Sequence, residues 1–131
     1  MWSRLVCLRT LVAFIFLAFV AVPVGAQEES PAEAEAMLVW QMDAVRDGDF
    51  ERFVERGNKA FKELVDRFFF ENHQMSWGRK AAKGYSLEYL GSVRRVGMRQ
   101  HLWTVTFTGD RYEHLGSVTL AGGKVVGFDL D

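Results

Sequence analysis

The chain has 131 residues, 49% of them hydrophobic, and a formal net charge of −1 from 16 Lys and Arg against 17 Asp and Glu. This length fits one domain, and the hydrophobic content suffices for a packed core, which excludes intrinsic disorder over most of the chain. The nearly balanced charge argues against nucleic-acid binding, because proteins of that class are usually strongly basic.

The first 26 residues have the three-part organisation of a secretory signal peptide. Two arginines precede an uncharged apolar run over residues 11–22, and the small residues at 24–26 match the spacing of a cleavage site. A membrane anchor is the alternative, but the apolar run is shorter than the roughly 20 residues that span a bilayer. We therefore expect an exported protein, periplasmic or extracellular, that contacts the membrane only through its uncleaved signal peptide.

The composition of residues 27–131 limits the chemistry of the processed protein. The single cysteine, Cys7, lies in the predicted signal peptide, which excludes disulfides, thiolate catalysis and cysteine metal ligands from the remainder. His73, His101 and His114 are too far apart in sequence to form a helical pair of metal ligands. We therefore expect no metal site, no cofactor and no nucleic-acid partner.

Residues 27–31 are acidic and contain a proline, which predicts a short flexible segment leading into one folded domain over residues 32–131. A first helix is predicted over residues 32–46, where apolar residues recur at spacings of four and three: Leu38, Met42 and Val45. Gly48 is expected to close this helix in the left-handed conformation. Asp49 is then expected to cap a short second helix, because its carboxylate can accept from backbone N–H groups.

A third and longer helix is predicted over residues 58–70. Four apolar residues recur there at i, i+3, i+4 and i+7 and would face the core: Phe61, Leu64, Val65 and Phe68. The helical pattern weakens after Phe70, because residues 71–84 mix polar side chains with few apolar ones. This stretch is expected to add only one further helical turn.

From Gly84 onward the hydrophobic period changes from about 3.6 to 2, which is typical of β-strands. Alternating apolar residues mark four successive strands, within residues 85–89, 103–107, 112–120 and 125–130. Four strands in succession favour an antiparallel meander. The predicted fold class is therefore α+β, with N-terminal helices packed on a curved four-stranded antiparallel sheet.

The turn at Gly109-Asp110 predicts a two-residue hairpin, since this pair of residues is a common hairpin signal. The hairpin would place three pairs of residues opposite each other: Phe107 and Tyr112, Val105 and His114, Trp103 and Gly116. A large indole opposite a glycine is a good steric match.

The turn at Gly122-Gly123 leaves two registers open for the last strand. A two-residue loop turns Val125, Gly127 and Asp129 toward the core. A three-residue loop that includes Lys124 turns the alternate set inward: Val126, Phe128 and Leu130. The second register buries more apolar area and is favoured.

Two local sequence features accompany this order of elements: the segment 47–51, Asp-Gly-Asp-Phe-Glu, and the terminal segment 123–128, Gly-Lys-Val-Val-Gly-Phe. With three helices before a four-stranded sheet, residues 32–130 resemble the nuclear-transport-factor-2-like superfamily, which includes ketosteroid isomerase and polyketide cyclases. The resemblance implies a cone-like sheet around the long helix, with an apolar pocket at its open end. It supplies no catalytic residues, since no position aligns with the tyrosine, aspartate or general base of the isomerase.

Candidate ligand-binding residues follow from the predicted Gly109-Asp110 hairpin. It places four aromatic or titratable side chains on one face of the sheet, and a fifth could join them: His101, Trp103, Tyr112, His114 and Tyr89. Such a pocket, with aromatic walls and two imidazoles, suits a small amphipathic or anionic ligand. In the alternative interpretation, both imidazoles lie at the solvated rim of the sheet.

Six basic residues interrupted by a single acidic one form a candidate anion-attracting rim: Arg79, Lys80, Lys83, Arg94, Arg95 and Arg99. The alternative is a solvated charged face. Asp129 is the carboxylate of most interest for catalysis, because the two-residue loop would bury it and raise its pKa. In the favoured register Asp129 is an ordinary solvated aspartate. The catalytic candidates are Asp129, His101 and His114.

Two functions from different classes fit these features. The first is an exported, non-enzymatic module that binds a small ligand or a protein partner through the pocket or the sheet, a homodimer through the sheet included. The second is an isomerase, dehydratase or cyclase of the cone fold that uses His, Asp or Tyr as acid and base. The first is favoured, because the sequence shows no catalytic constellation.

Overall fold

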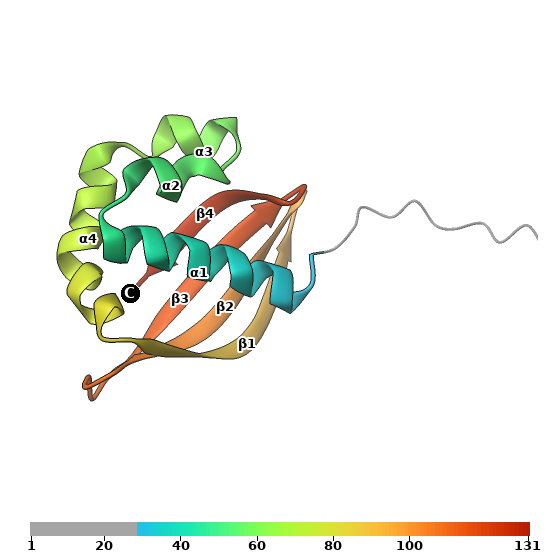
Figure 1. Cartoon of the computed structure of the whole chain (residues 1–131). Coiled ribbons are helices and arrows are strands. Elements are labelled where there is room, and N and C mark those ends of the chain that lie inside the picture. The colour runs from blue at the N-terminus through green and yellow to red at the C-terminus, as the bar shows by residue number, and fades with distance from the viewer. Residues whose placement is uncertain (1–28) are drawn as a thin grey trace, which may run out of the picture.

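The computed structural model describes residues 29–131, so the predicted signal peptide lies outside the described residues. Four helices precede four strands along the chain: α1 (Pro31–Asp47), α2 (Phe50–Glu55), α3 (Lys59–Leu64), α4 (Arg67–Ala82), β1 (Tyr85–Arg95), β2 (Met98–Phe107), β3 (Glu113–Ala121) and β4 (Lys124–Leu130). The strands form one antiparallel sheet in the order β1-β2-β3-β4, and α1 crosses one face of it (Figure 1). The predicted α+β class and meander are confirmed.

The predicted ends of the first helix are confirmed. Ser30 and Glu33 form a reciprocal capping box, in which each side chain accepts from the other's backbone N–H, at 3.2 and 2.7 Å. At the other end Gly48 has φ of 69° and donates to the carbonyl of Ala44. Asp49 caps α2 by accepting from the N–H of Arg52 at 3.0 Å.

The predicted long helix over residues 58–70 is wrong, because the chain breaks between α3 and α4. Val65 takes an extended conformation, and Asp66 caps α4 by accepting from the N–H of Phe69 at 2.8 Å. The break changes which side chains are buried: Leu64 and Phe68 are 81% and 71% exposed, although both were expected in the core. Local capping by an aspartate therefore overrides the apolar spacing.

The prediction of one further turn after Phe70 is also wrong, since α4 continues to Ala82. Gly78 is buried where α4 packs on α1, and a Cβ placed there would lie 3.3 Å from the carbonyl oxygen of Val45. Ala81 is buried beside it. Small residues let the two helices approach closely, so this face of α4 lacks the large apolar side chains that mark a helix in sequence.

The predicted register between β2 and β3 is confirmed, with Val105 opposite His114 and Trp103 opposite Gly116. The connection differs, however, because the strands are joined by the five residues 108–112 instead of a two-residue turn. Within this loop the carboxylate of Asp110 accepts from the N–H of Tyr112 at 3.2 Å. The third predicted pair, Phe107 and Tyr112, is not formed, because Tyr112 lies in this loop and the pairing ends at Thr106 and Glu113.

The last hairpin combines both predicted registers through a β-bulge. Its turn is the two-residue one, with Ala121 opposite Lys124 and Val125 buried. The register then shifts, so that Phe128 lies opposite Val118 and is buried together with Leu130. The greater burial of apolar area correctly predicted that Phe128 and Leu130 face the core. The extra residue that brings them there lies inside β4, however, and not in the loop as expected.

The core lies between α1 and the covered face of the sheet, called the inner face below. Trp103, Val105 and Phe107 of β2 are buried there against Leu38 and other apolar residues of α1. Phe53 of α2 joins this core to α4 and β4, with ring centroids 5.2 Å from Phe70 and 5.1 Å from Phe128. Within residues 29–131, no helix combines the length and apolar content needed to cross a bilayer.

Candidate functional site

Three of the predicted ligand-binding residues meet on the inner face of the sheet: Tyr89, His101 and Trp103, called the inner-face cluster. Tyr89 lies on β1 opposite Trp103, and its hydroxyl is 3.0 Å from Nδ1 of His101. The ring centroid of Trp103 is 5.4 Å from that of Tyr89 and 6.0 Å from that of His101. The side chains of His101 and Trp103 are fully buried, whereas Tyr89 is 36% exposed.

A β-bulge in β1 directly follows Tyr89. The register between β1 and β2 shifts after Tyr89, so that Gly91 lies opposite Leu102. Gly91 has φ of 140°, a conformation that side-chain-bearing residues rarely adopt. Leu90 is the extra residue, and Tyr89, just before the shift, keeps Trp103 opposite it and His101 as its diagonal neighbour on β2. The cluster therefore has one member at the solvent boundary and two in the core.

Buried polar atoms without partners mark this region. Nε2 of His101 and Nε1 of Trp103 have no hydrogen-bond partner within residues 29–131. An unpartnered buried polar group costs about 1–3 kcal/mol, so proteins rarely retain several of them without a reason.

The electrostatic environment keeps the imidazole of His101 neutral near pH 7. Burial lowers the pKa of His101, the positive charge of Arg99 lowers it further, and the carboxylate of Glu29 acts in the opposite direction. Glu29 also accepts from the N–H of Gly123 at 2.7 Å, which holds the segment before α1 against the β3–β4 turn. A neutral ring has one donor and one acceptor nitrogen.

His114 and Tyr112 do not belong to the inner-face cluster, which corrects the prediction of a single set. His114 lies opposite Val105, four positions along β2 from His101, or about 13 Å at the usual rise per residue. Tyr112 lies in the β2–β3 loop and is exposed. The prediction that His114 shares a face of the sheet with His101 is correct. The alternation of residues indicates only the face, however, and not the distance between two residues along the strands.

His114 instead joins a cluster that fastens the β2–β3 loop to α4. Oδ2 of Asp110 lies 2.8 Å from Nζ of Lys80 and 3.0 Å from Nε2 of His114. The ring of Trp77 packs beside His114, with centroids 4.9 Å apart. Hydrogen bonds from Lys80 and His114 hold the pKa of Asp110 well below its usual range. These polar groups satisfy one another, so the arrangement is structural.

The six basic residues do not form one rim. Arg79, Lys80 and Lys83 lie at the C-terminal end of α4, where β1 begins. The other three lie at the far end of β1 and the start of β2: Arg94, Arg95 and Arg99. The first nine residues of β1, 85–93, lie between the groups and span about 30 Å. Only the second group is near the inner-face cluster, since Arg99 is two positions from His101.

Asp129 is exposed and lies opposite Ser117, on the face of the sheet away from α1. The bulge in β4 produces this orientation even though the hairpin turn has two residues. The three catalytic candidates therefore occupy three separate places: His101 in the core, His114 near the β2–β3 loop and Asp129 on the outer face. Residues 29–131 contain no group of three or more His, Cys, Asp or Glu that could hold a metal ion.

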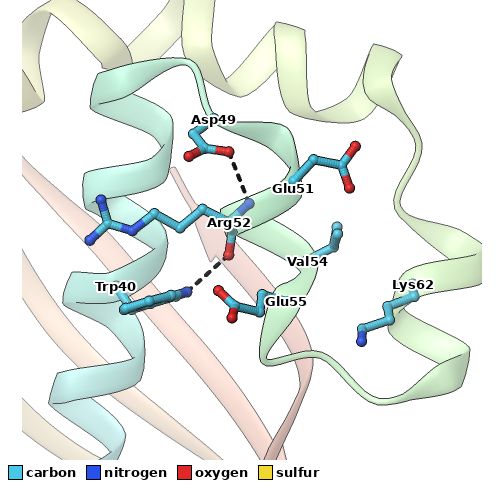
Figure 2. Close-up of a pocket in the computed structure, with 7 residues that line it drawn as sticks. All are labelled: Trp40, Asp49, Glu51, Arg52, Val54, Glu55 and Lys62. Atoms are coloured by element: carbon cyan, nitrogen blue, oxygen red, sulfur yellow. Dashed lines mark hydrogen bonds between the residues drawn. The ribbon is translucent and has the colours of Figure 1, made fainter.

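A groove between α1, α2 and α3 was not anticipated from the sequence. It has a volume of about 610 Å³ and is lined by Trp40, Asp49, Glu51, Arg52, Val54, Glu55 and Lys62 (Figure 2). Much of its charge is already paired within the chain, because Arg52 contacts Asp43 and Asp47 while Glu51 contacts Arg67. The groove consequently offers fewer unsatisfied groups to a ligand than the inner-face cluster does.

Comparison with known proteins found no relative: no family model, no curated protein and no solved structure matches the chain. The functional argument therefore depends on the residues themselves.

Proposed function

We propose that this protein is an exported small-molecule-binding module of the nuclear-transport-factor-2-like type, with its site at the inner-face cluster. The order of four helices before the C-terminal meander, with α1 across the sheet, supports the resemblance to that superfamily (Figure 1). The observation that carries the binding function is the pair of buried, unpartnered ring nitrogens on His101 and Trp103. Aromatic walls with a few polar atoms directed into them are typical of ligand sites.

Catalysis by acid and base is the second candidate, and the contact between Tyr89 and His101 is the observation that favours it. An enzyme of the isomerase type also needs a carboxylate or another proton acceptor close to the reacting atoms. Asp129 lies on the opposite face of the sheet, so it does not fill that role. Ligand binding requires only the groups that the cluster already provides, and it remains the preferred function.

A ligand screen tests the binding function. Compounds that bind the folded protein raise its melting temperature, and binding at the cluster also changes the fluorescence of Trp103. The Trp103→Phe variant should lose the fluorescence response, whereas the Trp77→Phe variant, which changes a tryptophan near the β2–β3 loop, should keep it. The proposal is overturned if a broad panel of metabolites produces neither response in the unsubstituted protein.

Export is tested separately by N-terminal sequencing of the protein recovered from outside the cytoplasm. Cleavage at the predicted site gives a chain that begins at Gln27. Recovery of the chain from the cytoplasm with its N-terminal segment intact would contradict export and leave the ligand site unaffected.

A further inference from the structure

We infer that the free edge of β1 pairs with the same edge of a second copy of this chain, over residues 85–89, in an antiparallel two-fold dimer. β1 is the outermost strand on its side of the sheet (Figure 1). An edge strand presents unpaired backbone N–H and C=O groups, which can form a ladder with a strand of another chain. The inference concerns this edge alone and does not depend on the proposed ligand function.

The opposite edge of the sheet is already occupied at its start. Val125 of β4 donates its N–H to the carbonyl of Arg56 at 2.9 Å, and its own carbonyl accepts from the N–H of Asn58 at 2.9 Å. Within residues 29–131, no backbone bond of this kind reaches the outer side of β1 between Tyr85 and Tyr89. The edge of β1 is therefore the available one, and pairing through a single edge closes at two copies.

The hydrogen-bond pattern shows which residues of β1 point to the free edge. Thr108 donates its N–H to the carbonyl of Gly84 at 2.9 Å, which marks these two residues as a hydrogen-bonded pair. Hydrogen-bonded and non-hydrogen-bonded pairs alternate in an antiparallel ladder, and the register is regular from Tyr85 to Tyr89. Ser86 and Glu88 therefore bond to β2. The main-chain groups of the alternate residues point outward: Tyr85, Leu87 and Tyr89.

The spacing of these outward positions is complementary to itself. A two-fold axis at Leu87 places Leu87 opposite Leu87 of the partner subunit and Tyr85 opposite Tyr89 of the partner subunit. All three outward positions then meet as hydrogen-bonded pairs. The bulge at Leu90 interrupts the alternation, so an axis elsewhere on the strand aligns fewer positions. The strand itself therefore specifies the register.

The side chains are compatible in this register. Each Tyr85 forms a cross-strand aromatic pair with Tyr89 of the partner subunit. Glu88 is the one charged residue of the segment 85–89, and it lies opposite Ser86 of the partner subunit, so no like charges face each other directly. Tyr89 is 36% exposed, and Tyr85 and Leu87 are half-buried. Pairing therefore covers apolar surface that one copy leaves partly open.

The packing of the helices leaves this edge accessible, and the small paired segment sets the strength of the dimer. Among the strands, α1 packs most closely on β3, which is separated from β1 by β2. Five paired residues bury less area than the roughly 1,200–2,000 Å² of a stable interface. We expect a weak dimer with a dissociation constant on the order of 100 µM.

Amide hydrogen exchange, followed by NMR at two protein concentrations, tests the inference. The sample is the chain from Gln27 onward, which contains every element of the described fold. Exchange of the outward N–H groups of Tyr85, Leu87 and Tyr89 should slow about three- to fourfold between about 20 µM and 1 mM, since the dimer protects them. The N–H groups of Ser86 and Glu88 bond to β2 and are the internal control, so their exchange should not change. Equal exchange of the outward groups at both concentrations overturns the inference.

A charge swap at Ser86 provides the second readout, because this side chain is exposed on the outer face and the fold does not depend on it. Ser86→Glu places a carboxylate opposite Glu88 of the partner subunit and should weaken the dimer at least about fivefold. Ser86→Lys places an opposite charge there and should tighten it about threefold. Thr119→Glu, on the same face of β3, is the matched control and should leave the dissociation constant within about twofold of the original.

Sedimentation velocity measures these dissociation constants. A protein that stays monomeric at about 1 mM overturns the inference. Equal dissociation constants for Ser86→Glu and Ser86→Lys also overturn it, because the two charges act on the dimer only where Ser86 faces Glu88 of the partner subunit. None of these outcomes bears on the ligand screen, so failure of the dimer and failure of the proposed function are distinguished.

Discussion

The hydroxyl of Tyr89 lies 3.0 Å from Nδ1 of His101, although the residue opposite His101 on β1 is Ser92. The contact is thus diagonal across the strand pair, since Tyr89 lies opposite Trp103 and His101 is two positions further along β2. It joins a fully buried imidazole to a side chain at the solvent boundary. The hydroxyl of Tyr89 is therefore the one hydrogen-bond partner of the His101 ring among residues 29–131.

The Tyr89→Phe variant measures how much this hydrogen bond contributes to the stability of the folded protein. The substitution keeps the ring and removes the hydroxyl, which leaves Nδ1 of His101 without its partner. We expect the free energy of unfolding to fall by about 1 kcal/mol, the usual net value of such a hydrogen bond, in denaturant titrations. Tyr85→Phe is the matched control on the same strand and face, and it should stay within about 0.5 kcal/mol of wild type. Equal losses in both variants would contradict the role of the Tyr89 hydroxyl.

The buried imidazole predicts a pH dependence of stability. The pKa of His101 is lower in the folded protein than in the unfolded chain, with Tyr89, Arg99 and Glu29 as the titratable or charged groups that act on it. As the pH falls below the unfolded value of about 6.5, the unfolded chain binds the proton more readily and stability decreases. Above that value both states are neutral at this site and the effect vanishes.

His101→Gln should remove this component of the pH profile. Melting temperatures measured between pH 7.5 and 5 should fall less steeply for the variant than for the wild-type protein, once the loss common to all pH values is subtracted. The measurement at pH 7.5 is the internal control, because the wild-type ring is already neutral there. Parallel profiles for the two proteins would show that His101 does not titrate differently on folding.

Local chemistry made several parts of the fold predictable from the sequence. Gly48 and Asp49 act within a few residues of themselves, so the end of α1 and the start of α2 followed from residue type alone. The pairing of Trp103 with Gly116 followed from the alternation of apolar residues and the position of the turn. Such short-range signals do not depend on the rest of the molecule.

The features that the sequence did not reveal arise from contacts between distant segments. The helix α4 continues where Gly78 packs closely against Val45 of α1, a residue 33 positions earlier in the chain. The inner-face cluster depends on the pairing of β1 with β2, which brings Tyr89 opposite Trp103 although no short turn in the sequence indicates that register. The split of the predicted site into two clusters depends on distance along β2, whereas periodicity specifies only the face.

A pair of phenylalanines on α4 tests the break between α3 and α4. Phe70 is 2% exposed and contacts the rings of Phe50 and Phe53, whereas Phe68 is largely exposed. Phe70→Ala should therefore cost about 3–5 kcal/mol of stability, and Phe68→Ala should cost less than about 0.5 kcal/mol. A large loss for Phe68→Ala would indicate that residues 58–70 form the continuous helix instead.

Asp110 should confer stability that is lost in acid. Its hydrogen bonds to Lys80, His114 and the N–H of Tyr112 hold its folded-state pKa below the ordinary value of 3.8. The stabilisation is thus complete above that value and declines as the pH falls through and below it. Asp110→Asn should lower the melting temperature at pH 7, and the difference from wild type should narrow toward pH 3. A constant difference over this range would contradict an ionic contribution.

Gly116 should tolerate no side chain because of its position over the core. A Cβ at this position would lie 2.8 Å from Cγ2 of Val105, whose β-branched side chain is fully buried and has little rotamer freedom. Gly116→Ala should cost about 1–3 kcal/mol through overpacking. Val105→Ala should remove the clash, so the double variant should be more stable than the sum of the two single losses predicts. Ser86→Ala, exposed on β1, controls for a simple strand substitution, and additive losses in the cycle would show that Gly116 is required for a reason other than its contact with Val105.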